Sequence, residues 1–205
     1  MNMLPNYEIY CVKYGERPGQ RPEHFIGGDP HDVPMPMDYF VWLIREPGSQ
    51  REVLVDTGFT AKMAIRGRVL LRTPAEGLAL IGCDASKIRD VIITHLHNDH
   101  VGTFYDFPNA SFHLQDKEME YVTGRHMAHH IFRRPYEIDE VTAMIRKVFA
   151  NQVVFHNGVG DIAPGISVHH IGGHTMGLQS VRVHTQRGWV VLAMCARCCV
   201  AWKPT

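Results

Sequence analysis

The ten residues 93–102, ITHLHNDHVG, are the feature that most restricts what this chain can fold into. They place three histidines and an aspartate within six positions, namely His95, His97, Asp99 and His100. The preceding run, DVII, has the apolar and β-branched character of a buried strand. Ligand-type side chains that follow such a strand lie in a loop at a sheet edge, where they can converge without breaking the sheet. The sequence therefore predicts a sheet-containing fold with a polar site at the end of a strand.

The residue types in this cluster are those that bind metals. Imidazole nitrogens and carboxylate oxygens are the usual ligands of catalytic zinc, which takes three protein ligands and keeps one position for water. His95 and His97 are two residues apart and can point the same way, while Asp99 and His100 can turn toward a neighbouring point. Ligands in two pairs predict two adjacent metal ions. The alternative is a polar loop that is rich in histidine by chance, which the HxHxDH spacing disfavours.

Length and composition favour one globular domain. The chain has 205 residues, 45% of them hydrophobic and 20% charged, enough for one substantial core and short for two. We therefore expect a single domain over residues 1–205. The 21 basic and 21 acidic residues are interspersed, so a basic surface for nucleic acid or for an anionic membrane is not predicted. The most basic stretch, residues 125–134, is interpreted as a solvated helix or loop face.

Targeting signals and cysteine usage favour a cytoplasmic protein. The start, MNMLPNYEIYCVKYGERPG, lacks the basic and apolar regions of a signal peptide. Apolar runs stay well below the ~18 residues of a membrane span. The cysteines are odd in number and crowd toward the end, unlike a disulfide framework: Cys11, Cys83, Cys195, Cys198 and Cys199. We expect small-molecule partners, and neither nucleic acid nor a membrane.

Hydrophobic periodicity predicts an α/β fold. Alternating and β-branched patterns predict strands at 7–15, 38–46, 52–59, 90–95 and 111–115. Helical spacing predicts helices at 70–83, 116–122 and 135–150. Four further strands, VVFH, ISVHHIGG, LQSVRVHT and GWVVLAM, are separated by turn residues and favour an antiparallel second half. Together these elements predict two sheets with helices outside.

Three motifs carry a resemblance to a known family. VDTG (residues 55–58), THLHNDHVG (94–102) and GGHT (172–175) resemble successive motifs of the metallo-β-lactamase superfamily. The resemblance implies a four-layer αββα sandwich with a zinc site between the sheet edges. Within the superfamily the chain resembles the N-acyl homoserine lactonases, through FIGGDPHDVPMPMDYFVW, HLQDKEMEY and IGGHTMGLQSVRV.

The resemblance also implies roles for individual residues. The ligands that it implies are His95, His97 and His174 for a first zinc, and Asp99 and His100 for a second. Asp56 in VDTG resembles the buried aspartate that orients such ligands, a role that metal sites generally require. The alternative for Asp56 is an aspartate that caps a turn.

The end of the chain departs from the family pattern. Family members continue with a sequence like VVLASDA, whose aspartate bridges both metals, and then supply a tyrosine and a final histidine. This chain has VVLAMCARCCVAWKPT, with Cys195 at the aspartate position, no histidine after His184 and no tyrosine after Tyr136. We therefore expect an incomplete C-terminal part, from a truncated or frame-shifted gene, which resequencing beside an intact-mass measurement tests.

Two interpretations of the tail bear on the metal count. Cys195 is a competent zinc ligand as a thiolate and can partly replace the aspartate, although sulfur makes a softer site. Cys195 and Cys198 also form a CxxC, which in other contexts is redox-active or half of a zinc knuckle. Because donors for the second metal are missing, we expect one tightly bound Zn²⁺ per chain, where intact relatives hold two.

The resemblance implies hydrolysis of an N-acyl homoserine lactone. Metal-activated hydroxide opens the ring, and Asp99 carries a proton to the leaving alkoxide. The alternatives are another hydrolase of the superfamily, of the glyoxalase II thioesterase or β-lactamase kind, and an inactive zinc-binding remnant. A homodimer is a further expectation. Four apolar residues line either the core, which we favour, or an acyl-chain pocket: Phe25, Met35, Met37 and Phe40.

Overall fold

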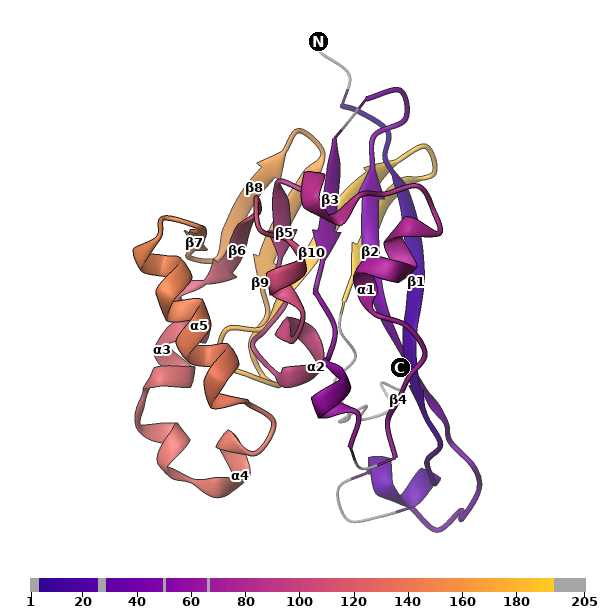
Figure 1. The fold of residues 1–205 in the computed structure, drawn as a ribbon, viewed down its shortest axis with the longest axis vertical. Helices are drawn as coiled ribbons and strands as arrows, with labels where there is room; N and C mark the ends of the chain where they lie inside the picture. Colours follow the sequence, from indigo (N-terminus) through magenta and orange to yellow (C-terminus); the bar gives the residue numbers. More distant parts are fainter. Residues whose placement is uncertain (1–3, 26–28, 50, 66, 194–205) are drawn as a thin grey trace, which may run out of the picture.

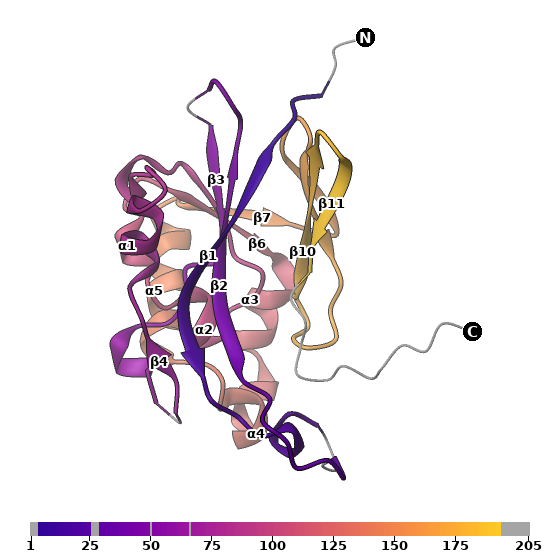
Figure 2. The same ribbon diagram turned by 90° about the vertical axis from the view of Figure 1, so that its right-hand side faces the viewer.

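Two β-sheets pack face to face in the computed structural model, which describes residues 4–25, 29–49, 51–65 and 67–193 (Figure 1). Helices cover the outer face of the first sheet. Figure 2 shows α1 and α5 on the side of that sheet that faces away from β10 and β11. The arrangement confirms the predicted sandwich of two sheets with helices outside.

The first sheet is mixed, with seven strands in the order β4-β1-β2-β3-β5-β6-β7. β1 pairs antiparallel with β2 and β4, and β2 with β3, whereas β3, β5, β6 and β7 run parallel. β3 and β5, in the middle of the sheet, are mostly apolar and buried because both of their faces are covered, whereas the edge strand β7 is partly exposed. The bounds are β1 Glu8–Arg17, β2 Met37–Arg45, β3 Glu52–Val55, β4 Val69–Leu70, β5 Asp90–Ile92, β6 Ser111–Gln115 and β7 Val153–His156.

The second sheet is antiparallel, with four strands in the order β11-β10-β9-β8. The bounds are β8 Val159–Ala163, β9 Ile166–His170, β10 Gln179–Thr185 and β11 Gly188–Leu192. The assignment of VVFH to this antiparallel half was wrong, because these residues form β7 and pair in parallel with β6. β8 was not predicted. Its sequence, VGDIA, contains two residue types that are depleted in strands, and pairing with β9 outweighs that preference.

Capping residues fix the start of α1. The predicted helix over 70–83 is shorter in the structure, α1 covering Pro74–Ala79. Thr73 and Glu76 form a reciprocal capping box at its start, and Pro74 occupies the first turn, where its missing N–H costs nothing. The other α-helices are α2 Asn98–Val101, α3 Asp116–Thr123, α4 His130–Arg133 and α5 Ile138–Phe149. Short 3-10 helices cover Arg21–His24, Ala61–Met63, Ala85–Lys87, Phe104–Asp106 and Arg125–Ala128.

Two apolar cores separate the layers. The larger core lies between the first sheet and its helices and includes Leu43, Phe59, Phe112 and Met144, all fully buried. The smaller core lies between the two sheets, where Ile44, Val55, Val168 and Val181 meet. Because the smaller core packs the two sheets against one another, loops at their common edge can form one site.

The outer face of the second sheet carries no helix within the residues that the structure describes. Val159 of β8 and both Trp189 and Val191 of β11 are exposed on this sheet. The predicted break in pattern and Cys195 fall on residues 194–205, which lie outside the described residues. No helix in the described ranges is long and apolar enough to cross a membrane.

Candidate metal centre

The residues of the histidine cluster leave the carboxyl end of β5 and enter α2. β5 ends at Ile92, and α2 begins at Asn98, so the cluster is partly helical and not only a loop. Two bonds fix this turn against the VDTG segment: the Thr57 N–H donates to the His100 carbonyl at 2.7 Å, and the Gly102 N–H to the Gly58 carbonyl at 2.7 Å. A Cβ atom at Gly102 would lie 2.8 Å from that carbonyl oxygen, so glycine permits this approach.

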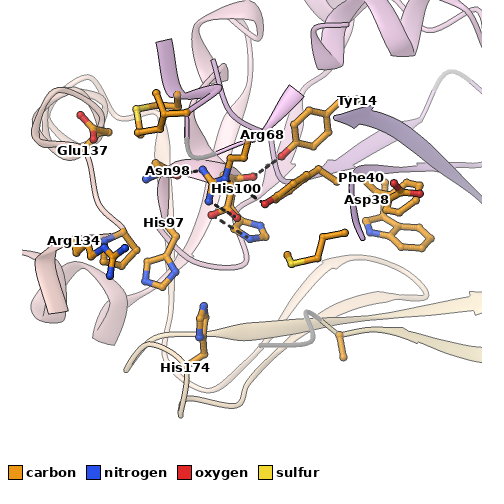
Figure 3. A pocket seen from close by; sticks show the side chains of 18 residues that line it. Tyr14, Asp38, Phe40, Arg68, His97, Asn98, His100, Arg134, Glu137 and His174 are labelled. Carbon is orange, nitrogen blue, oxygen red and sulfur yellow. Dashed lines mark hydrogen bonds and ion pairs between the residues drawn. The ribbon is translucent and has the colours of Figure 1, made fainter. Parts of the chain in front are cut away.

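Three histidines converge at the edge between the two sheets. Donor atoms of His95, His97 and His174 all lie within 4.8 Å of one another, a group that can hold a metal ion. His95 and His97 are buried, and His174 is exposed. Figure 3 shows His97 and His174 pointing toward one another from the two sides of the site. The structure therefore brings together the three residues that the resemblance assigns to the first zinc.

The histidine group fits a bound cation. The Nε2 atom of His95 is buried and has no hydrogen-bond partner among the described residues, while Nδ1 lies 3.1 Å from the Thr94 hydroxyl. An unpaired buried nitrogen costs free energy that coordination of a metal ion offsets. Burial, and then neighbouring imidazoles, hold the pKa of His95 well below 6.5 and lower that of His97 to about 3. The rings are therefore neutral, which is the form that binds metals.

Asp56 is a buried aspartate that bonds to two parts of the cluster. Its carboxylate accepts hydrogen bonds from the Thr94 N–H at 2.7 Å and from the Thr94 hydroxyl at 2.8 Å. It also forms a hydrogen bond with His100 Nδ1 at 2.8 Å. Its backbone has a positive φ of 61°, a conformation in which aspartate is enriched. These long-range bonds differ from the local bonds of a turn cap. They are those expected of a residue that orients His100 and, through Thr94, His95.

Asp99 and His100 form a separate pair. His100 Nε2 lies 3.8 Å from Asp99 Oδ1, and Arg68 Nη2 lies 3.5 Å from Asp99 Oδ2. Arg68 also donates to the Asn98 side chain at 2.8 Å and to the Tyr39 hydroxyl at 3.2 Å. Among the described residues, the three side chains that are grouped closely enough to hold one metal ion are His95, His97 and His174. Asp99 and His100 are not joined there by a third ligand.

Neighbouring charges determine the protonation of this pair. Burial raises the pKa of Asp99, but the charges of His100, Arg68 and His97 outweigh burial and hold that pKa below 3.8. Burial lowers the pKa of His100, but the carboxylates of Asp56 and Asp99 outweigh it and raise that pKa above 6.5. Asp99 is therefore a carboxylate at neutral pH.

A cavity of about 470 Å³ opens beside the cluster (Figure 3). This volume is in the range of small-molecule sites. Its apolar walls come from Met37, Phe40, Trp42, Met63 and Ile65, and its polar walls from Asp38, Arg134 and Glu137 as well as the cluster itself.

The sequence interpretation of the apolar residues was partly wrong. Phe40, for which the core was favoured, lines the cavity, because it shares the face of β2 that Trp42 and Ile44 turn toward the second sheet. Met37 lies on the opposite face, where it packs against the larger core as favoured and also lines the cavity. Met35 is exposed, and Phe25 packs beside Arg21, whose guanidinium carbon lies 4.8 Å from the ring centre. Arg68 was missed. Its neighbours in sequence show no pattern, and its contact with Asp99 spans a long stretch of chain.

Comparisons with known proteins place these features in a family. Residues 35–193 match the model of the metallo-beta-lactamase superfamily. A curated N-acyl homoserine lactonase from Bacillus sp is 24% identical over 171 residues, which cover 76% of this chain and 63% of the relative. The chain thus spans less than two thirds of that relative's length.

Solved structures show the same fold at low identity. An N-acyl homoserine lactone hydrolase with the product N-hexanoyl-L-homoserine at its catalytic metal centre aligns with a TM-score of 0.71 at 18% identity, covering 94% of this chain and 76% of that one. The dizinc quorum-quenching lactonase AidC aligns with a TM-score of 0.67 at 18% identity, covering 92% and 71%. With its matched family model, its two-sheet fold and its clustered histidines, this chain belongs to the metallo-beta-lactamase superfamily.

Proposed function

We propose that the chain is a zinc-dependent hydrolase that opens the ring of N-acyl homoserine lactones. The observation that carries this proposal is the convergence of three imidazoles beside a cavity of about 470 Å³. Lactonases among the relatives and the fold neighbours favour the lactone over other substrates of the superfamily.

Zinc is the metal that this donor set suits best. Three imidazole ligands with one position left for water are typical of catalytic zinc. His95, His97 and His174 supply such a set, whereas Asp99 and His100 offer only two donors within the described ranges. We therefore propose one tight site formed by the three histidines and a much weaker one at the pair. When bound, zinc supplies Lewis-acid polarisation of a carbonyl and acidifies water, which provides a nucleophile at neutral pH.

Asp99 is the residue that we assign to proton transfer. Hydrolysis adds water to the lactone carbonyl carbon and breaks the ring C–O bond, so a proton must move from that water to the departing alkoxide oxygen. The Asp99 carboxylate, ionised because His100, Arg68 and His97 outweigh its burial, can accept that proton and then deliver it. Its side chain lines the cavity.

The cavity matches the two chemical ends of the proposed substrate. An N-acyl homoserine lactone has a polar ring with an amide and an apolar acyl chain. The polar ring would lie beside the cluster, and the chain would lie against Met37, Phe40 and Trp42. Loss of the Phe40 ring should therefore raise KM several-fold for long acyl chains and less for short ones, because longer chains bury more apolar area.

The decisive experiment measures metal content and turnover on one sample. Purified protein is dialysed, its zinc is counted, and the sample is assayed with an N-acyl homoserine lactone, a thioester and a β-lactam. We expect about one zinc per chain and ring opening that is lost after chelation and restored by zinc. Faster turnover of the thioester or of the β-lactam assigns the other hydrolase class. Zinc without turnover of any substrate identifies a binding remnant, and two tightly held zincs contradict the proposed single site.

A further inference from the structure

A buried carboxylate joins the two loops that carry the clustered histidines. Glu118, in the first turn of α3, is fully buried. Its Oε1 accepts the Leu96 N–H at 2.9 Å and the Tyr136 hydroxyl at 3.3 Å. Its Oε2 accepts the Thr175 hydroxyl at 2.6 Å and the Gly177 N–H at 3.0 Å. The carboxylate therefore has a donor at each of its roughly four acceptor positions.

The donors to Glu118 lie next to the histidines in sequence. Leu96 stands between His95 and His97, and Thr175 directly follows His174. A movement of the Leu96 backbone therefore moves both neighbouring histidines, and a movement of Thr175 moves His174. One side chain thus sets the separation between the loop that leaves β5 and the loop between β9 and β10.

Close packing reinforces this connection. A Cβ atom at Gly177 would overlap the backbone nitrogen and the Cβ of Glu118, so only glycine allows the His174 loop to lie directly on α3. Tyr136 contributes from the other side, since its ring lies 4.7 Å from that of His97 in an edge-to-face contact. Glu118 is therefore hydrogen-bonded to three segments that adjoin the histidines, at Leu96, at Tyr136 and at Thr175 to Gly177.

The chemistry of Glu118 favours a positioning role over simple packing. A buried carboxylate is costly unless its oxygens are fully hydrogen-bonded, and an apolar side chain would fill the same space at less cost. Charge-assisted bonds to backbone N–H groups are stronger and more directional than apolar contacts. We propose that Glu118 is a positioning residue that holds His95 and His97 at metal-binding distance from His174. This inference rests on the metal site of the proposed function.

The test compares zinc affinity across variants at the carboxylate and at its donors. Zinc dissociation constants are measured by competition with a chromophoric chelator, and the Co²⁺ absorption spectrum reports ligand geometry. In Glu118→Gln the amide NH₂ must face at least one N–H or hydroxyl donor, so one loop is released. We expect affinity to fall about 10- to 100-fold, as for other residues that orient metal ligands, with a changed Co²⁺ spectrum.

Matched variants separate positioning from general destabilisation. Tyr136→Phe removes one hydrogen bond to Glu118 but releases neither loop, so zinc affinity should stay within about threefold of the unaltered chain. Thr175→Val removes the hydroxyl donor beside His174 and should weaken binding about tenfold, whereas Thr175→Ser keeps the hydroxyl and should restore it.

The outcomes distinguish this inference from the proposed function. If the unaltered chain binds zinc and Glu118→Gln binds it equally well, the positioning role is overturned and the metal site stands. If Glu118→Gln does not fold, the contrast between Thr175→Val and Thr175→Ser decides, and equal affinities in those two variants reject the link. An unaltered chain that binds no zinc overturns both proposals.

Discussion

The two halves of the candidate metal centre differ in what the protein already supplies to them. In the half formed by His95, His97 and His174, the imidazoles are clustered and the Nε2 atom of His95 has no hydrogen-bond partner among the described residues. In the half formed by Asp99 and His100, a guanidinium from Arg68 already lies 3.5 Å from the carboxylate.

This difference concerns charge as much as ligand number. In the first half, burial and neighbouring imidazoles lower the pKa of His95 and His97, and the buried Nε2 atom of His95 has no hydrogen-bond partner among the described residues. The second half contains an acidic group whose charge Arg68 and His100 already partly balance. A second divalent ion would therefore meet a nearby positive charge and, among the described residues, too few donors. If the proposed assignment of ligands holds, one HxHxDH motif would serve one metal strongly and a second one weakly.

The largest effect should follow removal of a ligand from the histidine half. His95→Ala should weaken zinc binding by about a hundredfold or more, because a three-ligand site becomes a two-ligand site. The metal-free protein should lose little stability, since the variant also removes the unpaired buried nitrogen. Competition titration and urea unfolding measure the two effects. His129→Ala, at an exposed histidine, is the control, and equal affinities in both variants would remove His95 from the ligand set.

Asp56→Asn tests whether one buried carboxylate supports both halves. Asparagine has the same size as aspartate and tolerates the positive φ. Its NH₂ group can donate a hydrogen bond to His100 Nδ1, and the ring proton of His100 then lies on Nε2. We expect metal affinity and turnover to fall about tenfold or more. Nitrogen NMR of His100 should report the change of tautomer. An unchanged tautomer together with full affinity would assign Asp56 only a structural role.

Glu140, on α5 near Asp99, tests the electrostatics of the second half. Burial, and then Glu137 and Asp99, raise the pKa of Glu140 from 4.5 to about 8. The folded state therefore keeps a proton that the unfolded state loses, so stability from this group falls as pH rises above 4.5 and is lost above about 8.

Glu140→Gln should remove the loss of stability that Glu140 causes as pH rises. The variant should match the unaltered chain near pH 4.5 and exceed its free energy of unfolding by roughly 2 kcal/mol at pH 9, a value reduced for partial solvent contact. Urea unfolding at the two pH values gives the comparison. A stability difference that does not change with pH would show that Glu140 titrates normally.

The smallest expected effect tests Arg68 directly. Arg68→Met removes the positive charge beside Asp99 and should strengthen binding of a second metal equivalent by about tenfold, while the first equivalent binds as before. Isothermal titration with zinc resolves the two steps. Arg187→Met, at an exposed arginine, is the matched control for loss of one charge. A second step that weakens in Arg68→Met would mean that Arg68 orders Asp99 more than it repels the metal.

Local patterns predicted the parts of the molecule that depend on neighbours in sequence. The HxHxDH cluster lies within one short segment, and apolar periodicity located strands such as β2 and helices such as α5. The association of His174 with this cluster came from the family resemblance, since nothing in its local sequence specifies a partner in the other sheet. Arg68 and Glu118 contact distant segments, so their local sequence does not identify their partners, although HLQDKEMEY, which contains Glu118, contributes to the family resemblance. β8 was missed for the related reason that pairing outweighed its composition.

The origin of the three histidines in two different sheets has a consequence for the amount of protein in a cell. His95 and His97 follow β5 of the first sheet, and His174 precedes β10 of the second. A metal held by all three ties the sheets together and binds only the folded chain. At free zinc a hundredfold above the dissociation constant, this linkage adds about 2.7 kcal/mol. Partial opening between the sheets, and proteolysis through it, would then become rarer as zinc rises. Metal supply would thus regulate the lifetime of the protein as well as its chemistry.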